Sequence, residues 1–413
     1  MIRTREAKLR ESVDAMSARQ LFLAVAGPLF LLFLLTSNRG VPYHIDSFSN
    51  VLPAWSLGTS GSVYLPEHRV LIEPDYHGNI AWLVPSEDSV VSKYPPGAAF
   101  LAAPLYALWP QEAEVWTVFG YNRSEAAPVA IPVPPFWPGA IAASLSVALA
   151  MGFLAVSFRS FATTSTALVG AYLAALGTTA WSVAANELWQ HGPGMMWIAL
   201  AGVLTGKRLV LGGLAYGLAV LTRPLNAFIA AGTGIYLSLQ RRSPWPALKI
   251  GVGAMAGLGV LLAFNAAVFG EPSVLGGYEP GFVSSAQSLD LLGYGRNVVM
   301  ALVSPTRGLL VWSPFLIVLI PGLVAAWRAA PGWVRGGAIG GAAYLLVQYK
   351  ANRYSGGSGF ATYRYPLEAL TAAAPLLFLS YTKWVAKRPR AVRVFRVLAI
   401  LAVTAHTSFA VTG

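Results

Sequence analysis

Charged residues stand at two points of the long polar segment that follows the first apolar stretch of the chain. Asp46 follows Tyr43 and His44 near its start, and Lys93 opens the motif Lys93-Tyr94-Pro95-Pro96 further along. A carboxylate at the mouth of a membrane helix is costly unless it has a partner or a task. We interpret Asp46 as a general base or orienter for an acceptor hydroxyl. The alternative is that Asp46 caps a following helix near 47–57.

Lys93 has the surroundings of an anion-binding residue. Pro95 and Pro96 fix the backbone just after it, so the amine is presented from a stiff position. A lysine at a membrane face suits an anionic headgroup, and a phosphate is the foremost such anion. We therefore expect Lys93 and Tyr94 to contact a donor phosphate. Pairing with bulk anionic lipid, or with Glu87 and Asp88, is the alternative.

Four arginines stand at one predicted edge of the membrane: Arg223, Arg307, Arg353 and Arg364. Burying an unpaired guanidinium costs several kcal/mol, so each needs a carboxylate or a phosphate. Arginine also suits bidentate contact with phosphate. Each one alone could be a snorkelling anchor, but four on the same face favour a common phosphate site.

A polar and aromatic cluster, residues 186–193, separates two apolar stretches and contains Glu187, Trp189 and His191. Such clusters bind sugars by stacking an aromatic ring on the sugar and by hydrogen bonds to its hydroxyls. Trp189 by itself is also typical of a membrane interface. We expect His191 and Glu187, together with His44, to contact the sugar or phosphate of a donor.

Several classes of chemistry lack the residues that they need. The chain has no cysteine, which excludes disulfides and thiolate sites, and its five histidines form no HExxH motif. We expect no metal and no cofactor. A Walker-type phosphate loop is absent, and acids inside the apolar stretches are few. These absences argue against an ATP-driven pump and an ion-coupled transporter.

The composition is that of an all-α polytopic membrane protein. Of the 413 residues, 55% are hydrophobic and 11% are charged. The mean hydropathy is +0.57, far above that of a soluble domain. We predict about eleven transmembrane helices in one domain, residues 1–413. Their approximate ranges are 21–38, 138–158, 163–183, 192–206, 209–222, 225–240, 246–268, 309–327, 333–349, 365–382 and 395–411.

The distribution of charge predicts how the chain is oriented in the membrane. It also accounts for the net charge of +12, so that no nucleic-acid partner is needed to explain it. With residues 1–20 in the cytoplasm, that side receives nineteen of the 29 Lys and Arg but three of the 17 acids. The predicted extracytoplasmic segments are then 39–137, 269–308 and 350–364. Within the first, we expect Pro96 to Trp109 to form a surface helix, because fourteen residues are too few to span. The composition of Glu112 to Pro135 favours an irregular connector.

These residues together resemble the membrane-embedded glycosyltransferases of the C-type fold (GT-C). More narrowly, the chain is similar to the bacterial branch related to protein O-mannosyltransferases and lipid A aminoarabinose transferases. The resemblance rests on an acid soon after the first span, on a Lys-x-Pro element before a surface helix, and on the stretches 188–193, 217–224 and 304–310. It extends over most of residues 20–380.

The resemblance implies a polyprenyl-phosphate-linked sugar donor and an inverting, metal-independent transfer at the outer face. Asp46 would be the base, while Lys93 and arginines would hold the donor phosphate. The family's acid often belongs to an acidic pair, whereas Ser47 follows Asp46 here. Asp75 and Asp88 therefore remain alternatives for the base.

We thus predict a multi-pass glycosyltransferase of the plasma (inner) membrane. It would transfer a sugar of mannose or arabinose type from a polyprenyl-phosphate carrier to a lipid, glycan or protein acceptor of the cell envelope. The alternative is a non-enzymatic flippase, transporter or binder of polyprenyl-linked lipids. That alternative accounts equally well for Lys93 and the arginines, but it gives Asp46 no specific role.

Overall fold

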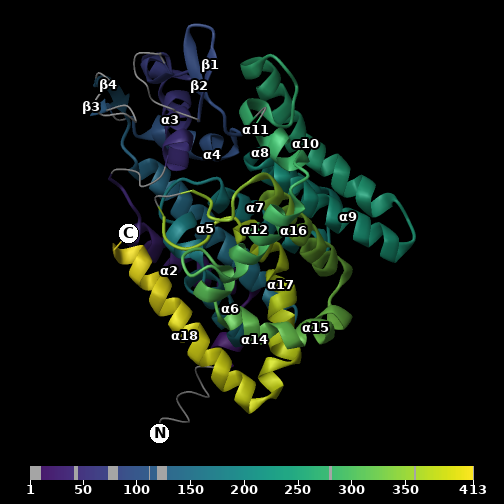
Figure 1. Ribbon diagram of the computed structural model, residues 1–413. Helices are drawn as coiled ribbons and strands as arrows, with labels where there is room; N and C mark the ends of the chain where they lie inside the picture. Colours follow the sequence, from purple (N-terminus) through teal and green to yellow (C-terminus); the bar gives the residue numbers. More distant parts are fainter. Residues whose placement is uncertain are drawn as a thin grey trace.

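The structure is a computed structural model that describes residues 11–40, 45–72, 82–110, 112–118, 128–278, 281–357 and 360–412. Helices carry most of these residues and pack into one bundle, with the segment of α3 and α4 at its upper end (Figure 1). The long helices are α2 (Ala18–Thr36), α5 (Trp137–Arg159), α6 (Thr164–Leu176), α7 (His191–Thr205), α8 (Leu209–Thr222), α9 (Ala227–Arg241), α10 (Trp245–Phe269), α16 (Gly332–Ala351), α17 (Leu367–Lys383) and α18 (Pro389–Thr412).

Each predicted span coincides with helical structure, but two of the spans are interrupted. The span 163–183 consists of α6, which ends at Leu176, and a separate π-helical turn at Ala180–Ala184. The segment 309–327 is also not one helix. It is broken into α13 (Leu309–Trp312), α14 (Phe315–Leu319), a 3-10 turn at Ile320–Gly322, and α15 (Leu323–Ala329). Pro314 and Pro321 account for the breaks, because proline lacks the backbone N–H that continues a helix. The expectation of one continuous span here was wrong. Two further helices, α11 (Gly281–Gln287) and α12 (Leu291–Val303), precede α13.

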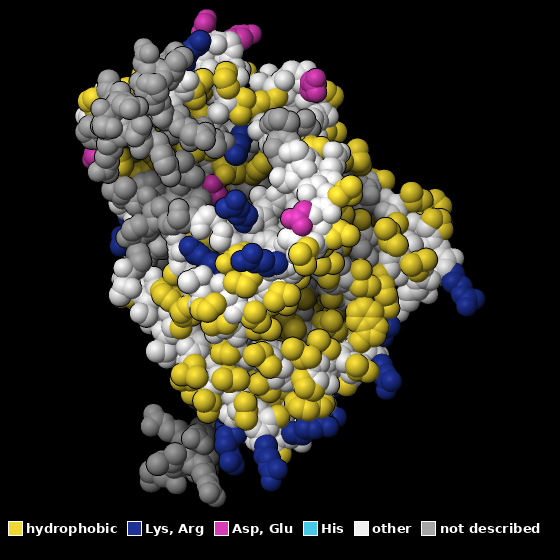
Figure 2. All heavy atoms as spheres, viewed as in Figure 1, with side chains coloured by type: hydrophobic (Ala, Val, Ile, Leu, Met, Phe, Trp, Pro, Cys, Tyr) yellow, Lys and Arg dark blue, Asp and Glu magenta, His cyan; other side chains and the backbone are white. Residues whose placement is uncertain are grey.

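Four helices among the described residues are long and apolar enough to cross a membrane: α2, α5, α10 and α18. Figure 2 shows a broad belt of apolar side chains across this face of the molecule, with Lys and Arg at its lower edge. The Asp and Glu side chains visible on this face lie above that belt. Leu35 and Ile400 are among many large apolar side chains left exposed on the helices. These features place the chain in a membrane, while the count of about eleven crossings stays a prediction.

The first long loop holds two helices, α3 (Ile45–Ser60) and α4 (Gly97–Leu108), as the sequence predicts. It also holds two antiparallel hairpins, so the expectation of surface helices alone was incomplete. Strands β1 (Leu83–Ser86) and β2 (Ser89–Ser92) form the first, and β3 (Glu114–Val118) and β4 (Val129–Val133) form the second.

The second hairpin corrects the expectation of an irregular connector over 112–135. Both strands are rich in valine, isoleucine and tryptophan, which suit a pleated surface. The prolines of this segment favour a connector, but a two-stranded sheet has only edges, where Pro132 is tolerated. The carbonyl of Pro132 accepts a hydrogen bond from the His68 ring at 2.8 Å, which ties β4 to the 3-10 helix Pro66–Ile72.

Two close backbone contacts fix the loop on the bundle. At the start of α4, a Cβ on Gly97 would lie 2.6 Å from the Thr222 Cα at the end of α8. Likewise, a Cβ on Gly277 would lie 2.6 Å from the Lys93 Cα. Only glycine allows these approaches, which hold Lys93 close to the end of α8. The loop is thereby positioned against the helices that carry the arginines.

Candidate functional site

A polar cavity of about 450 Å³ lies where the first loop meets the ends of α7, α8 and α16. Six of the predicted site residues line it, and they come from five separate segments of the chain. Its polar and aromatic lining side chains include Asp46, Asn50, Lys93, Tyr94, Trp189, His191, Arg223, Tyr278, Gln348, Arg364 and Tyr365.

Asp46 stands in the first turn of α3, with both carboxylate oxygens bonded to distant segments. The Tyr94 hydroxyl donates to one oxygen at 2.5 Å, and the Arg364 guanidinium donates to the other. Burial, and next the Asp46 charge, raise the pKa of Tyr94 well above its ordinary value, so that the hydroxyl stays protonated. The pair keeps access to the cavity, because the Asp46 side chain is 16% exposed.

Lys93 faces the same cavity with aromatic neighbours. Its amine lies 5.6 Å from the centre of the Tyr94 ring and 5.7 Å from that of Tyr278, distances at which a cation and a ring attract. No carboxylate of the described residues lies within ion-pair distance of it. Burial lowers the pKa of Lys93, and the Asp46 charge offsets this only in part. Lys93 is therefore a half-buried cation whose surroundings suit an incoming anion.

Among the described residues, neither Glu87 nor Asp88 lines the cavity, although the sequence offered both as possible partners of Lys93 and Asp88 also as an alternative base. Asp88 is exposed in the turn between β1 and β2, where it pairs with Arg69 at 3.5 Å. Arg69 also donates to the Glu87 carbonyl at 2.7 Å. Asp75 lies outside the described residues. Among the described acids, Asp46 is thus the one that lines the cavity.

Arg223 follows α8 directly and belongs to a second charged cluster. Its guanidinium lies 3.3 Å from a Glu368 oxygen and donates to the Gln348 side chain at 3.0 Å. It also lies 5.7 Å from the centre of the Tyr344 ring and 5.5 Å from that of Tyr365. Sequence reasoning found no acid near Arg223, because its partner stands in α17, 145 residues away.

His191 completes this cluster at the start of α7. Its Nδ1 lies 2.9 Å from Glu368 and also 2.9 Å from Arg223. One nitrogen cannot donate to the first and accept from the second at once. The carboxylate can only accept, so we assign the proton to Nδ1 and the hydrogen bond to Glu368. In the neutral ring Nε2 then has no proton and can accept from the Arg223 guanidinium, which lies 3.2 Å away.

Glu368 is the residue that sequence reasoning missed. Its side chain is fully buried, at 0% exposed, and it joins the α7 and α8 residues to α17. The available signal was an acid at the start of an apolar stretch, four residues after Arg364. Sequence reasoning also missed three other residues that line the cavity, because no pattern in the sequence distinguishes them from ordinary helix or loop residues. They are Tyr278, Gln348 and Tyr365.

Four predicted residues are not among those that line the cavity. Arg307 donates to the backbone carbonyls of Thr362 at 2.9 Å and Gly357 at 3.3 Å, and so fixes the segment before Arg364. Arg353 is exposed. Glu187 is buried and accepts a hydrogen bond from the Asn38 side chain at 2.7 Å. His44 lies outside the described residues.

Comparisons with known proteins find likeness in structure. No model of a known protein family matches the chain, and no curated protein matches it in sequence. The structure is similar to the crystal structure of ArnT from Cupriavidus metallidurans bound to undecaprenyl phosphate, with a TM-score of 0.53 and 18% identity. The archaeal oligosaccharyltransferase AglB from Archaeoglobus fulgidus, in complex with an inhibitory peptide and a dolichol-phosphate, has a TM-score of 0.49 and 10% identity.

The match to ArnT covers 91% of this chain and 62% of ArnT, and that to AglB covers 95% and 55%. The chain thus spans about three fifths of the length of ArnT. At this identity the match concerns the fold, and it confirms the resemblance to the C-type fold that the sequence predicts.

Proposed function

We propose that this chain is a membrane glycosyltransferase that takes its sugar from a polyprenyl-phosphate carrier. The observation that carries the proposal is the polar cavity, in which Asp46 and the cation Lys93 face the same space. The ArnT-like fold supports it, since the ArnT structure holds undecaprenyl phosphate. A flippase would need the cations but would not need a carboxylate facing them.

The donor phosphate would bind at Lys93, with Arg223 and Arg364 completing the positive surroundings. Both arginines already have carboxylate partners, so their remaining N–H groups are available for a second acceptor. Lys93 has rings and no carboxylate of the described chain beside it, which makes it the first residue to neutralise a phosphate. Tyr94 and Tyr278 would shield this contact from water and thereby strengthen it.

In the proposed reaction the acceptor hydroxyl enters beside Asp46 and replaces the Tyr94 hydroxyl as a donor to the carboxylate. Its oxygen attacks the anomeric carbon from the face opposite the phosphate, and the bond between that carbon and the phosphate oxygen breaks. The hydroxyl proton passes to Asp46, and the electron pair leaves with the polyprenyl phosphate. Lys93 and the arginines stabilise this charge as preorganised cations, and the product has inverted configuration.

The sugar itself would lie among the aromatic and amide side chains of the cavity. Trp189, Tyr278 and Tyr365 offer ring faces, while Asn50 and Gln348 offer hydrogen bonds to hydroxyls. His191 Nε2, which lies 3.2 Å from the Arg223 guanidinium, would accept from a hydroxyl of the sugar in place of the arginine N–H. This lining suits a neutral or basic sugar of mannose or arabinose type.

We further propose the predicted placement in the plasma (inner) membrane. Residues 1–20 would be cytoplasmic, and the cavity would face the extracytoplasmic side together with 39–137, 269–308 and 350–364. Residues 1–413 would act as one domain. The acceptor would be a lipid, glycan or protein of the envelope.

The test uses the full chain in phospholipid vesicles with a radiolabelled polyprenyl-phosphate mannose or aminoarabinose. We expect label to move to an envelope lipid or glycan fraction and free polyprenyl phosphate to accumulate in equal amount. Label that crosses the bilayer while it stays on its carrier would instead identify a flippase. In that case the enzyme proposal fails.

A further inference from the structure

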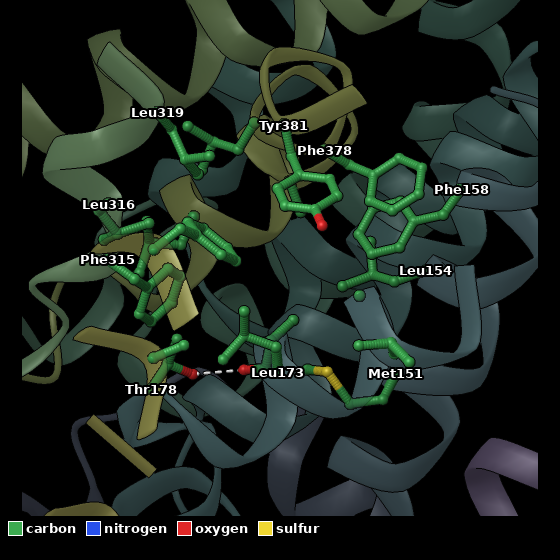
Figure 3. A pocket seen from close by; sticks show the side chains of 18 of the residues that line it. Met151, Leu154, Phe158, Leu173, Thr178, Phe315, Leu316, Leu319, Phe378 and Tyr381 are labelled. Atoms are coloured by element: carbon green, nitrogen blue, oxygen red, sulfur yellow. Dashed lines mark hydrogen bonds between the residues drawn. The ribbon is translucent and has the colours of Figure 1, made fainter. Parts of the chain in front are cut away.

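A second, apolar cavity of about 590 Å³ lies between α5, α6, α14, α17 and α18. Figure 3 shows Phe315, Leu316 and Leu319 on one side of this space and Met151, Leu154 and Phe158 on the other. Its volume is that of a ligand pocket, for which about 300–1,000 Å³ is usual. None of the lining residues of the polar cavity takes part in it.

The apolar cavity is long and runs along the axis of α17. Leu367 near the start of that helix and Tyr381 near its end both line it. Fourteen residues of helix correspond to about 21 Å. The hydrocarbon of one leaflet is about 15 Å thick, half of a bilayer core of roughly 30 Å. A single extended acyl chain therefore suits the length of the cavity.

Polar groups gather at the end that lies farthest from the Asp46 site. Ser165, Thr166, Tyr381 and Arg396 line the cavity there. The Tyr381 hydroxyl points into the apolar space (Figure 3). Among the described residues, no carboxylate pairs with Arg396. Asp14, which lies close by, instead accepts a hydrogen bond from the Ser165 backbone N–H at 2.8 Å.

Arg396 also belongs to a basic groove over the start of α18. Arg396 and Ile400 line both the apolar cavity and this groove, to which Lys387 and Arg393 contribute as well. Residues 383–396 contain six Lys and Arg and no acid. Four to eight basic residues beside a membrane helix are typical of binding to anionic lipids. The chemistry of the groove therefore complements a phosphate.

We propose that the apolar cavity and the basic groove form one binding site for an anionic glycerophospholipid of the surrounding leaflet. One acyl chain lies in the cavity, and the phosphate contacts Arg396, Arg393 and Lys387. The lipid is not the sugar donor, because this phosphate position lies one length of α17, about 20 Å, from the segment that carries Arg364. The site therefore holds a lipid that supports the packing of α18 against α6 and α14.

The test is a titration of the delipidated full chain in detergent with phosphatidylglycerol or with phosphatidylcholine, followed by native mass spectrometry. We expect one phosphatidylglycerol to bind in preference to phosphatidylcholine. Arg396→Gln removes one cation and should weaken that binding about fivefold. Arg241→Gln is the matched control, because Arg241 is exposed at the end of α9, lies outside residues 383–396 and lines neither space. It should bind as the wild type does.

A second variant tests the cavity itself. Ala374→Phe places a ring in the space beside Leu377 and should abolish the preference, while the melting temperature reports whether the variant folds. Equal binding of the two lipids, or unchanged binding by Arg396→Gln, would overturn the proposal. Displacement of phosphatidylglycerol by an equimolar amount of undecaprenyl phosphate would also overturn it, since the site would then belong to the donor's tail.

Discussion

Two charged clusters border the polar cavity, and they differ in exposure. The Asp46–Arg364 pair lines the cavity, and the Asp46 side chain is 16% exposed. The Glu368 carboxylate, which holds Arg223 and His191, is 0% exposed and does not line the cavity. Both clusters join segments that are far apart in the sequence. The difference in access separates a carboxylate that can meet a substrate from one that can only position other groups.

The Glu368 carboxylate, which is fully buried, carries a larger cost of removal from water than the partly exposed Asp46 carboxylate. Removing ions from water costs several kcal/mol each, and attraction between them offsets this only with good geometry. Glu368 recovers the cost through His191 and Arg223, and Gln348 takes a further N–H of Arg223. Such a cluster fixes the direction of Arg223. We therefore expect changes at Asp46 to affect turnover and changes at Glu368 to affect stability.

The largest effect is expected from Asp46→Asn. The amide keeps the size of the side chain but cannot take the proton of the acceptor hydroxyl. We expect turnover of a labelled polyprenyl-phosphate sugar to fall about 100- to 10,000-fold, the contribution usual for a general base. Binding of the donor lipid, measured by its quenching of tryptophan fluorescence, should persist.

Asp88→Asn is the matched control, because Asp88 is exposed in a hairpin turn and pairs only with the half-exposed Arg69. Its turnover should equal that of the wild type. If Asp46→Asn retains full turnover with donor binding intact, Asp46 is not the base.

Glu368→Gln should give the largest loss of stability. It removes the negative charge that Arg223 and His191 share, which leaves the partly buried Arg223 cation without compensation. Breaking such a pair costs about 3–5 kcal/mol, measured as the free energy of unfolding in denaturant. Turnover of the folded fraction should fall less than in Asp46→Asn.

A double-mutant cycle with Arg223→Met makes this comparison sharper. Because the two residues are partners, the double variant should lose less stability than the sum of the single losses. Additive losses would show that Glu368 does not act through Arg223.

The pH dependence of donor binding tests Lys93. Burial lowers its pKa below the ordinary value near 10.5, so the folded protein releases this proton more readily than the unfolded chain does. Burying the charged ammonium therefore lowers the stability of the folded protein at pH values below the lowered pKa. This cost in stability disappears as the pH rises through that pKa. Donor affinity should fall about tenfold over the same pH interval, because a neutral amine no longer neutralises the phosphate.

Lys93→Arg supplies the control, because a guanidinium stays protonated throughout this interval. Its donor affinity should be weaker at neutral pH, since arginine changes the geometry, but flat with pH. If donor affinity declines equally with pH in the wild type and in Lys93→Arg, the group that titrates is not Lys93.

The smallest effects concern the two arginines that lie outside both clusters. Arg307→Gln removes hydrogen bonds to the backbone of Thr362 and Gly357. This loss should lower the free energy of unfolding by about 1–2 kcal/mol. Turnover should fall slightly, because that segment leads to Arg364. Arg353→Gln is the matched exposed variant and should leave stability and turnover unchanged in thermal and radiolabel assays.

The sequence by itself indicated most of the long helices and several of the charged residues that line the polar cavity. Apolar stretches and their lengths depend on local chemistry, and most of the predicted helix ranges accordingly match, although 163–183 and 309–327 are interrupted. Asp46, Lys93 and Arg223 were identifiable because a charge beside an apolar stretch is costly wherever it stands. The second hairpin was missed because strand pairing depends on contact between two segments and local composition signals it only weakly.

Tertiary structure alone decided which charges meet. Arg364 reaches Asp46 across 318 residues and Glu368 reaches Arg223 across 145, and no local pattern encodes such distances. It also separated residues of the same type, since Arg223 and Arg364 line the cavity while Arg307 holds a loop and Arg353 faces outward. The physical reason is that a charge shows in the sequence, whereas its partner and its exposure depend on how distant helices pack.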